Sequence, residues 1–201
     1  TLDKDKCKGC TNCIKHCPTE AIRVRNGKAV IIRERCIDCG ECIRVCPYHA
    51  KKAVTDPLSS IEEYKYKIAL PAPSLYGQFG TNFSRERIID ALKHFGFDYV
   101  FEVARAAEIV THASAQYMKN EKIKKPVISS ACPAVVRLIQ VRFPSLIENL
   151  IRIESPMEVA AALSKREVHD KFGIPFEDMG AFFISPCAAK VTSVEAPYEN
   201  K

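Results

Sequence analysis

The stretch Cys7–Pro18, CKGCTNCIKHCP, recurs 29 positions later as Cys36–Pro47, CIDCGECIRVCP. Each copy has three cysteines at intervals of three residues, then a fourth cysteine four residues on that is followed by proline. A disulfide framework does not require the same tight spacing twice. Zinc uses pairs of Cys-x2-Cys half-sites and has no need of a third evenly spaced thiol. Three thiols in one short loop therefore favour an iron–sulfur cluster, whose fourth ligand comes from elsewhere.

This segment resembles bacterial two-cluster ferredoxins, in which the fourth cysteine of each run binds the cluster of the other run. The resemblance implies an α+β ferredoxin-like domain over residues 1–56 that holds two [4Fe-4S] clusters. It also implies two crossed ligand sets, which are Cys7, Cys10, Cys13 and Cys46 for one cluster, and Cys36, Cys39, Cys42 and Cys17 for the other.

The residues between and after the cysteine runs suit such a domain. Residues 21–34, AIRVRNGKAVIIRE, predict two short strands joined at Asn26-Gly27, which is a strong hairpin signal. The patterns PTEAI (18–22) and PYHAKKAV (47–54) follow each fourth cysteine and predict short helices, because proline is favoured in a first helical turn.

Beyond a linker at residues 57–66, the chain alternates short apolar runs with helical patterns, which predicts a domain over residues 67–201. Such alternation implies parallel strands with right-handed crossovers, and hence an α/β domain with a mostly parallel sheet. The strands are expected within 66–73, 97–103, 125–131 and 180–185, and the helices within 84–96, 104–120, 133–143 and 155–172. The last helix starts with Ser155, Pro156 and Glu158, which predicts a capping box.

Two further cysteines stand at junctions between a predicted strand and the next helix. Cys132 precedes Pro133, and Cys187 follows Pro186. A helix N-terminus lowers the pKa of a thiol and favours the thiolate, so either cysteine can bind a metal. The alternative is a small buried residue at a tight junction. The residues alone leave both interpretations open.

The order of the two cysteine runs, SSACPAVV (129–136) and SPCAAK (185–190) resembles the catalytic large subunit of [FeFe]-hydrogenases. The family motifs are approximately Thr-Ser-Cys-Cys-Pro and Met-Pro-Cys-x-x-Lys. The resemblance implies that residues 67–201 are the first lobe of the H-cluster domain. It implies that Cys132 and Cys187 ligate the cubane half of the H-cluster, with Pro133, Pro186 and Ser185 around the cofactor. It further implies a catalytic role for Lys190, which contacts a cyanide ligand of the two-iron unit.

The sequence departs from these motifs where the family moves protons. Ala131 replaces the cysteine that supplies the proton, and a methyl group has no acid–base chemistry. Ser185 replaces the methionine, and His112 and Ser114 stand where glutamates are expected. These substitutions resemble the divergent, sensory-type branch of the family, which is often fused to signalling domains.

A third cubane needs four thiolates, but only Cys132 and Cys187 remain after the ferredoxin ligands are assigned. The third motif of the family is missing from the 201 residues, so we expect the sequence to be part of a longer parent protein. The chain alone is then expected to carry two [4Fe-4S] clusters and to be inactive. The H-cluster is expected only in the complete parent.

The resemblance favours an iron–sulfur electron-transfer module and partial active-site lobe of a hydrogenase-like protein. Its parent would oxidise hydrogen or reduce protons reversibly and slowly, or sense hydrogen or redox state. Expected partners are a redox protein, such as a ferredoxin or another electron carrier, and a downstream signalling domain in the parent. The alternative is a ferredoxin-type electron-transfer protein fused to an α/β interaction domain without hydrogenase activity.

Composition excludes other classes. The formal net charge of +6 counts all cysteines as neutral, and two cubanes of about two negative charges each would lower it to about +2. The basic residues are scattered and lack interleaved aromatic residues, so no nucleic-acid groove is expected. No apolar run approaches the roughly 18 residues of a membrane span, so neither a membrane span nor a signal peptide is expected. Exposed cubanes imply an anaerobic, reducing compartment, most simply the cytoplasm.

Overall fold

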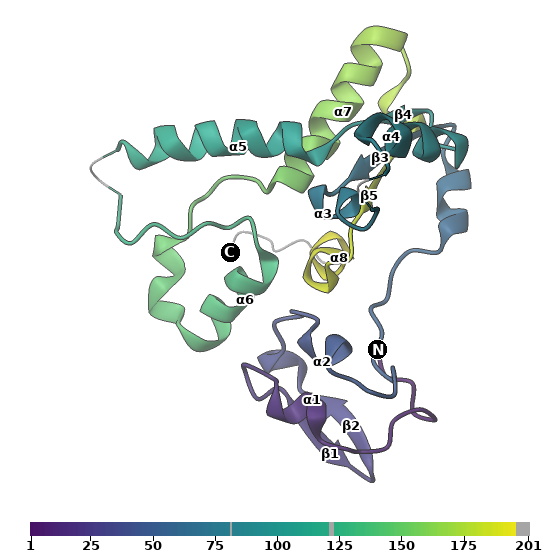
Figure 1. The fold of residues 1–201 in the computed structure, drawn as a ribbon. Helices are drawn as coiled ribbons and strands as arrows, with labels where there is room; N and C mark the ends of the chain where they lie inside the picture. The colour runs from purple at the N-terminus through teal and green to yellow at the C-terminus, as the bar shows by residue number, and fades with distance from the viewer. Residues whose placement is uncertain (81, 121–122, 196–201) are drawn as a thin grey trace. The chain divides into compact units, whose positions relative to one another are not determined.

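The computed structural model describes residues 1–80, 82–120 and 123–195 (Figure 1). The chain forms two compact units, and each unit is assembled from separate stretches. The first comprises Thr1–Thr55, Lys124–Leu150 and Cys187–Lys201, and it contains all ten cysteines, so we call it the cysteine unit. The second comprises Asp56–Ile123 and Ile151–Pro186, and we call it the sheet unit. The linear boundaries 1–56, 57–66 and 67–201 stay a prediction.

The cysteine unit contains the predicted hairpin. Strands β1 (Ile22–Arg25) and β2 (Lys28–Ile31) pair antiparallel. Asn26 and Gly27 both adopt positive φ, at 50° and 71°, which the tight two-residue turn requires. The hairpin prediction is confirmed.

The short helices of the cysteine runs lie before each fourth cysteine, not after it. They are α1 (Asn12–Lys15) and α2 (Glu41–Arg44), and the start of one is 29 residues after the start of the other. The helices predicted over 18–22 and 47–54 were therefore wrong. Glu20 and His49 adopt φ of 53° and 47°, and this left-handed conformation cannot continue a right-handed helix.

The sheet unit is built on a three-stranded parallel sheet. Strand β3 (Tyr66–Pro71) lies between β4 (Tyr99–Val100) and β5 (Met179–Ile184), and both pairings are parallel. The last four residues of β3 are buried, so both faces of this strand are covered. The expectation of a mostly parallel sheet is confirmed.

Helices of the sheet unit follow the predicted pattern. The capping box predicted at Ser155 is present: its hydroxyl accepts from the Glu158 N–H, and the Glu158 carboxylate accepts from the Ser155 N–H. No helix in the described part of the chain combines the length and apolar character needed to cross a membrane. The helices are α3 (Pro73–Tyr76), α4 (Arg85–His94), α5 (Val103–Met118) and α7 (Pro156–Phe172), with 3₁₀ helices at Leu58–Glu63 and Phe176–Asp178.

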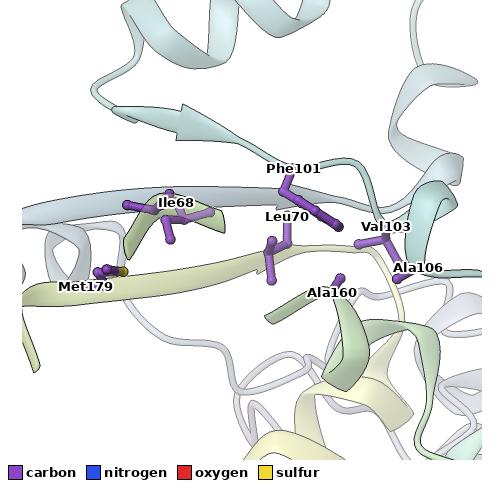
Figure 2. Close-up of a cluster of buried hydrophobic side chains, with 8 residues drawn as sticks. Ile68, Leu70, Phe101, Val103, Ala106, Ala160 and Met179 are labelled. Carbon is purple, nitrogen blue, oxygen red and sulfur yellow. The ribbon is translucent and has the colours of Figure 1, made fainter. Parts of the chain in front are cut away.

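An apolar core fills the sheet unit (Figure 2). Ile68 and Leu70 from β3 and Met179 from β5 are almost fully buried. The loop after β4 adds Phe101, and side chains of α5 and α7 complete the cluster, so the sheet and its helices share one core.

The strand predicted over 125–131 was wrong. In the described residues the sheet has three strands, and this segment belongs to the cysteine unit. Ile128 donates its N–H to the Asn149 carbonyl at 2.8 Å, and Asn149 Nδ2 donates to the Pro126 carbonyl at 2.7 Å. The segment is therefore held by its own helical neighbour, with an isolated bridge between Ile128 and Leu150 in place of a ladder. Helix α6 (Pro133–Arg142), a 3₁₀ helix (Pro144–Asn149) and α8 (Ala188–Glu195) complete the unit.

Candidate metal centres

Two cavities in the cysteine unit are lined by the cysteines of the two runs. The first has a volume of about 300 Å³, and the second has a volume of about 20 Å³. We call them the Cys36 cavity and the Cys7 cavity. Each is lined by three cysteines of one run and the fourth cysteine of the other run. The Cys36 cavity is lined by Cys36, Cys39, Cys42 and Cys17, and the Cys7 cavity by Cys7, Cys10, Cys13 and Cys46.

The repeat in the sequence is also a repeat in the backbone. Three pairs of residues, each separated by 29 positions, share a left-handed conformation. These pairs are Gly9 and Asp38 with φ of 66° and 51°, Thr11 and Gly40 with 66° and 77°, and Glu20 and His49 with 53° and 47°. The two runs therefore trace similar loops, and the loops present their cysteines in the same order.

Backbone N–H groups point at the cysteine sulfurs. The Ala21 N–H donates to Cys17 Sγ at 3.2 Å, and the Ala50 N–H donates to Cys46 Sγ at 3.3 Å. These two hydrogen bonds are again 29 residues apart. Their N–H groups bond to sulfur, whereas in a helix they would bond to a backbone carbonyl. N–H donors to sulfur stabilise the thiolate and influence the reduction potential of a bound cluster.

Similar bonds act on Cys7 and Cys36. Burial tends to raise the pKa of Cys7, but N–H donors from Ala29 and Gly9 and the nearby lysine charges bring it below its ordinary value. Burial raises the pKa of Cys36, which the Asp38 N–H only partly opposes.

Burial also acts on two further cysteines of the runs. It raises the pKa of Cys13, and it raises the pKa of Cys42 to about 11. Without a metal, these thiols are neutral at pH 7. Metal binding at these positions therefore releases protons.

The donor set fits a cluster better than a single ion. In the ranges that the structure describes, no group of three or more metal-binding side chains lies close enough to hold one ion. A cubane bonds each thiolate to a different iron, so its thiolates stand apart around the cluster. Four cysteines around each cavity are a donor set that iron–sulfur clusters use. The Cys7 cavity, at about 20 Å³, would have to widen to hold a cubane.

Cys132 and Cys187 also lie in the cysteine unit. Cys132 is the N-cap residue of α6 and is exposed, and half-buried Cys187 directly precedes α8. The two helices contact each other. Lys190 on α8 donates from Nζ to the Ala131 carbonyl at 3.3 Å, so the structure brings Lys190 to the residue before Cys132.

The other predicted residues of these motifs have separate positions. Pro133 is buried in the first turn of α6. Half-buried Ser185 and exposed Pro186 follow β5 and belong to the sheet unit. His112 and Ser114 lie on α5 of the sheet unit.

Helices α6 and α8 also adjoin the Cys36 cavity. Ala188 and Thr192 of α8 line that cavity. Gly40 lies so close to α8 that a β-carbon there would be 3.4 Å from the Ala188 β-carbon. Arg137 on α6 donates from Nε to the Cys36 carbonyl at 3.4 Å. The Cys36 cavity is therefore next to the elements that carry Cys132 and Cys187.

Sequence reasoning missed two residues of this region. Nothing in the sequence pattern identifies Arg137 as a contact of the cysteine loop. Lys51 lines both cavities. The sequence does contain a signal for it, because Lys51 stands at the position of the second run that is equivalent to the apolar Ile22 of the first.

Comparison with known proteins gives two family matches. The family model for the C-terminal domain of the iron-only hydrogenase large subunit matches residues 65–200. The family model for the 4Fe-4S dicluster domain matches residues 1–47. The predicted ferredoxin-like region and the predicted resemblance of the remainder are confirmed.

Individual relatives agree with these matches. The periplasmic [Fe] hydrogenase large subunit of Nitratidesulfovibrio vulgaris is 28% identical over 208 residues, which cover 94% of this chain and 49% of the relative. Iron hydrogenase 1 of Clostridium pasteurianum is 27% identical over 232 residues, which cover 100% and 40%. The cytosolic Fe-S cluster assembly factor NAR1 of Yarrowia lipolytica is 28% identical over 99 residues, which cover 49% and 20%. The chain spans about half the length of these relatives or less.

Solved structures show the same fold. A variant of [FeFe]-hydrogenase HydA1 from Chlamydomonas reinhardtii superposes with a TM-score of 0.53 at 22% identity, covering 71% of this chain and 38% of that one. At this identity the likeness establishes the fold alone.

Proposed function

This chain belongs to the iron-only hydrogenase large-subunit family, and on that premise we propose that it transfers electrons through two [4Fe-4S] clusters in a hydrogenase-like protein. One observation carries the proposal: each cavity is lined by three cysteines of one run and the fourth of the other. The proposed ligands are Cys36, Cys39, Cys42 and Cys17 in the Cys36 cavity, and Cys7, Cys10, Cys13 and Cys46 in the Cys7 cavity.

The linings of the two cavities support an order for the transfer. A bound cluster supplies a centre that accepts and releases one electron. Each cavity has an exposed cysteine, Cys10 or Cys39, but of the two cavities α8 lines the Cys36 cavity, so a redox protein would approach at the Cys7 cavity. Ala188 of α8 lines the Cys36 cavity, which supports electron exchange between that cavity and the Cys132 and Cys187 motifs. The protein partner is then a ferredoxin or a similar electron carrier.

The second part of the proposal concerns an incomplete site. Cys132 and Cys187 provide two of the four thiolates that the cubane of an H-cluster needs, with Pro133, Pro186 and Ser185 as their neighbours in the motifs. The chain's ten cysteines do not fit a complete H-cluster, so the missing ligands would have to come from residues outside these 201. Lys190, held at the Ala131 carbonyl, is the proposed catalytic residue.

Ala131 supports a slow or sensory role in the complete protein. Its methyl group has no proton to transfer, so rapid hydrogen oxidation or proton reduction by the family's usual route is not expected. We propose a cytoplasmic, anaerobic protein whose hydrogen or redox signal passes to a further domain of the parent.

Iron analysis tests the two-cluster proposal. The anaerobically purified chain should contain about eight irons and no zinc, because each cubane contains four. Cys17→Ala should leave about four irons by emptying the Cys36 cavity, although Cys17 belongs to the other run. The matched control Cys132→Ala, at an exposed cysteine in the same unit, should retain about eight irons. About four irons in the unmodified chain, or zinc in place of iron, would overturn the proposal.

A second candidate function follows from the same departure. Ala131 favours an electron-transfer protein with an α/β interaction domain and no hydrogenase activity. The match to an Fe-S cluster assembly factor, which covers 49% of the chain, also favours it. Ala131→Cys in the complete protein separates the two candidates. Increased hydrogen turnover supports the hydrogenase-like function, and unchanged cluster content with no turnover supports the second.

A further inference from the structure

Lys51 occupies a position where the other half of the repeat has an apolar residue. It lies 29 positions after Ile22, and each follows the alanine whose N–H donates to a fourth cysteine. Ile22 is 2% exposed and Lys51 is 4% exposed. The fold therefore buries a cation at a place that a hydrophobic side chain can fill.

The ammonium group of Lys51 is buried and has no hydrogen-bond partner within residues 1–80, 82–120 and 123–195. Burying a charge is costly unless an opposite charge or hydrogen bonds compensate for it. An unpartnered buried ammonium therefore indicates an anion that the protein itself does not supply.

Both cavities are in reach of this side chain, since Lys51 lines the Cys36 cavity and the Cys7 cavity. Its charge acts on thiols of both ligand sets. Burial raises the pKa of Cys13 and of Cys42, and the positive charge of Lys51 opposes that rise at each of them. Lys51 is thus placed to act on two anionic groups at once.

We propose that Lys51 is a shared counter-cation that makes both clusters easier to reduce. The inference rests on the two-cluster function proposed above. A cubane with four thiolates carries about two negative charges, and about three after it accepts one electron from a donor. A fixed cation in a buried site stabilises the more negative state, so it raises the reduction potential. Lys51 binds no iron itself and acts only through its charge.

Midpoint potentials of the reconstituted full chain test this role. We would titrate it anaerobically with dithionite and follow the reduced clusters by electron paramagnetic resonance. In Lys51→Met both potentials should fall, and electron affinity should weaken about tenfold, which is about 59 mV for a one-electron couple. The matched control is Lys4→Met, which removes the same charge from an exposed lysine that lines neither cavity and should leave both potentials unchanged.

Two more variants separate charge from packing. Lys51→Arg keeps the charge and should keep both potentials near the original values. Lys51→Ile introduces the residue found at the equivalent position of the repeat, and should lower both potentials as Lys51→Met does. Unchanged potentials in the neutral variants, a shift equal to that of Lys4→Met, or loss of iron from all three Lys51 variants would overturn the inference. The iron content of the unmodified chain tests the two-cluster function separately.

Discussion

The two units of this protein differ in what their cores are made of. The main buried cluster of the sheet unit is apolar and includes Ile68, Leu70, Phe101 and Met179. The buried cluster of the cysteine unit includes two of its proposed ligands, Cys7 and Cys13, together with Ile22, Ala29 and Ala50. The sheet unit can therefore reach a packed state with its own side chains, whereas the cysteine unit depends on what its cysteines hold.

The cavities show the same contrast. A volume of about 300 Å³ lies among the cysteines of one set, and the surrounding core residues are mostly small. Small cores of this kind are commonly completed by metals or disulfides. The ten cysteines form no disulfide, and eight of them line the two cavities, so metal binding would add to the stability of this unit.

Removal of iron should show the difference between the two units most strongly. Anaerobic chelation should unfold the cysteine loops, because metal-binding free energy there is folding free energy. Hydrogen exchange should show loss of protection at the Ala21 and Ala50 amides, with protection retained in β3. Retained protection at both alanine amides in the iron-free chain would contradict the conclusion that the cysteine unit depends on bound metal.

Leu70→Ala should damage the other unit. Leu70 is 1% exposed in the sheet core, and truncation of such a residue costs about 2–5 kcal/mol through lost burial and a cavity. Denaturant unfolding of β3 and its helices should show this loss, while the iron content stays the same. Leu58→Ala, at a residue that is 60% exposed, should change stability by less than about 0.5 kcal/mol. A parallel loss of iron in Leu70→Ala would show that the units are not independent.

Gly9→Ala should weaken the cysteine unit by a smaller amount. Gly9 has φ of 66°, and a β-carbon there would lie 2.6 Å from the Gly27 carbonyl oxygen. The left-handed conformation alone costs a non-glycine residue about 1–2 kcal/mol, and the contact adds to it. Gly27→Ala is the control, since its φ is 71° but no atom lies within 4 Å of its β-carbon. Iron retention during denaturant titration should fall further for Gly9→Ala, and equal losses would exclude a role for the close approach.

Glu167→Gln should give the smallest effect, in the sheet unit. Hydrogen bonds from Lys171 and then Tyr99 hold the pKa of Glu167 below its ordinary value against the opposing effect of burial. The stability from this ionised carboxylate is therefore present above its unfolded pKa of about 4.3 and is lost as pH falls through the lower folded pKa. Urea unfolding between pH 7 and pH 3 should show a shallower acid limb for Glu167→Gln. Asp170→Asn, at an exposed side chain, should leave the limb unchanged.

Local signals in the sequence were sufficient for several elements. The Asn26-Gly27 turn and the Ser155 capping box were predicted because each depends on a few neighbouring residues. The spacing of the cysteine runs, with the ferredoxin resemblance, also predicted two ligand sets of four cysteines. These ligand sets stay a prediction, and the cavity linings that support them contain three members of one short loop each.

Predictions failed where a contact that the sequence pattern does not mark decided the structure. The helices expected after each fourth cysteine do not form, since the Ala21 and Ala50 amides bond to sulfur instead of to a helical carbonyl. The strand expected at 125–131 pairs with its own following segment, and no local pattern announces Asn149 as its partner. Lys51 was missed because lysine is rarely buried, and only the comparison with Ile22 marks it as unusual.

The cysteine unit is made of three stretches, and this has a consequence for the order in which a ribosome delivers them. All eight cysteines of the two runs emerge by Cys46, about 140 residues before Cys187 and the wall that α8 provides. At common elongation rates this interval is on the order of ten seconds. During that time the Cys36 cavity lacks one side, so cluster delivery to the nascent chain meets an open site. Synthesis of α8 then adds the missing side of the cavity.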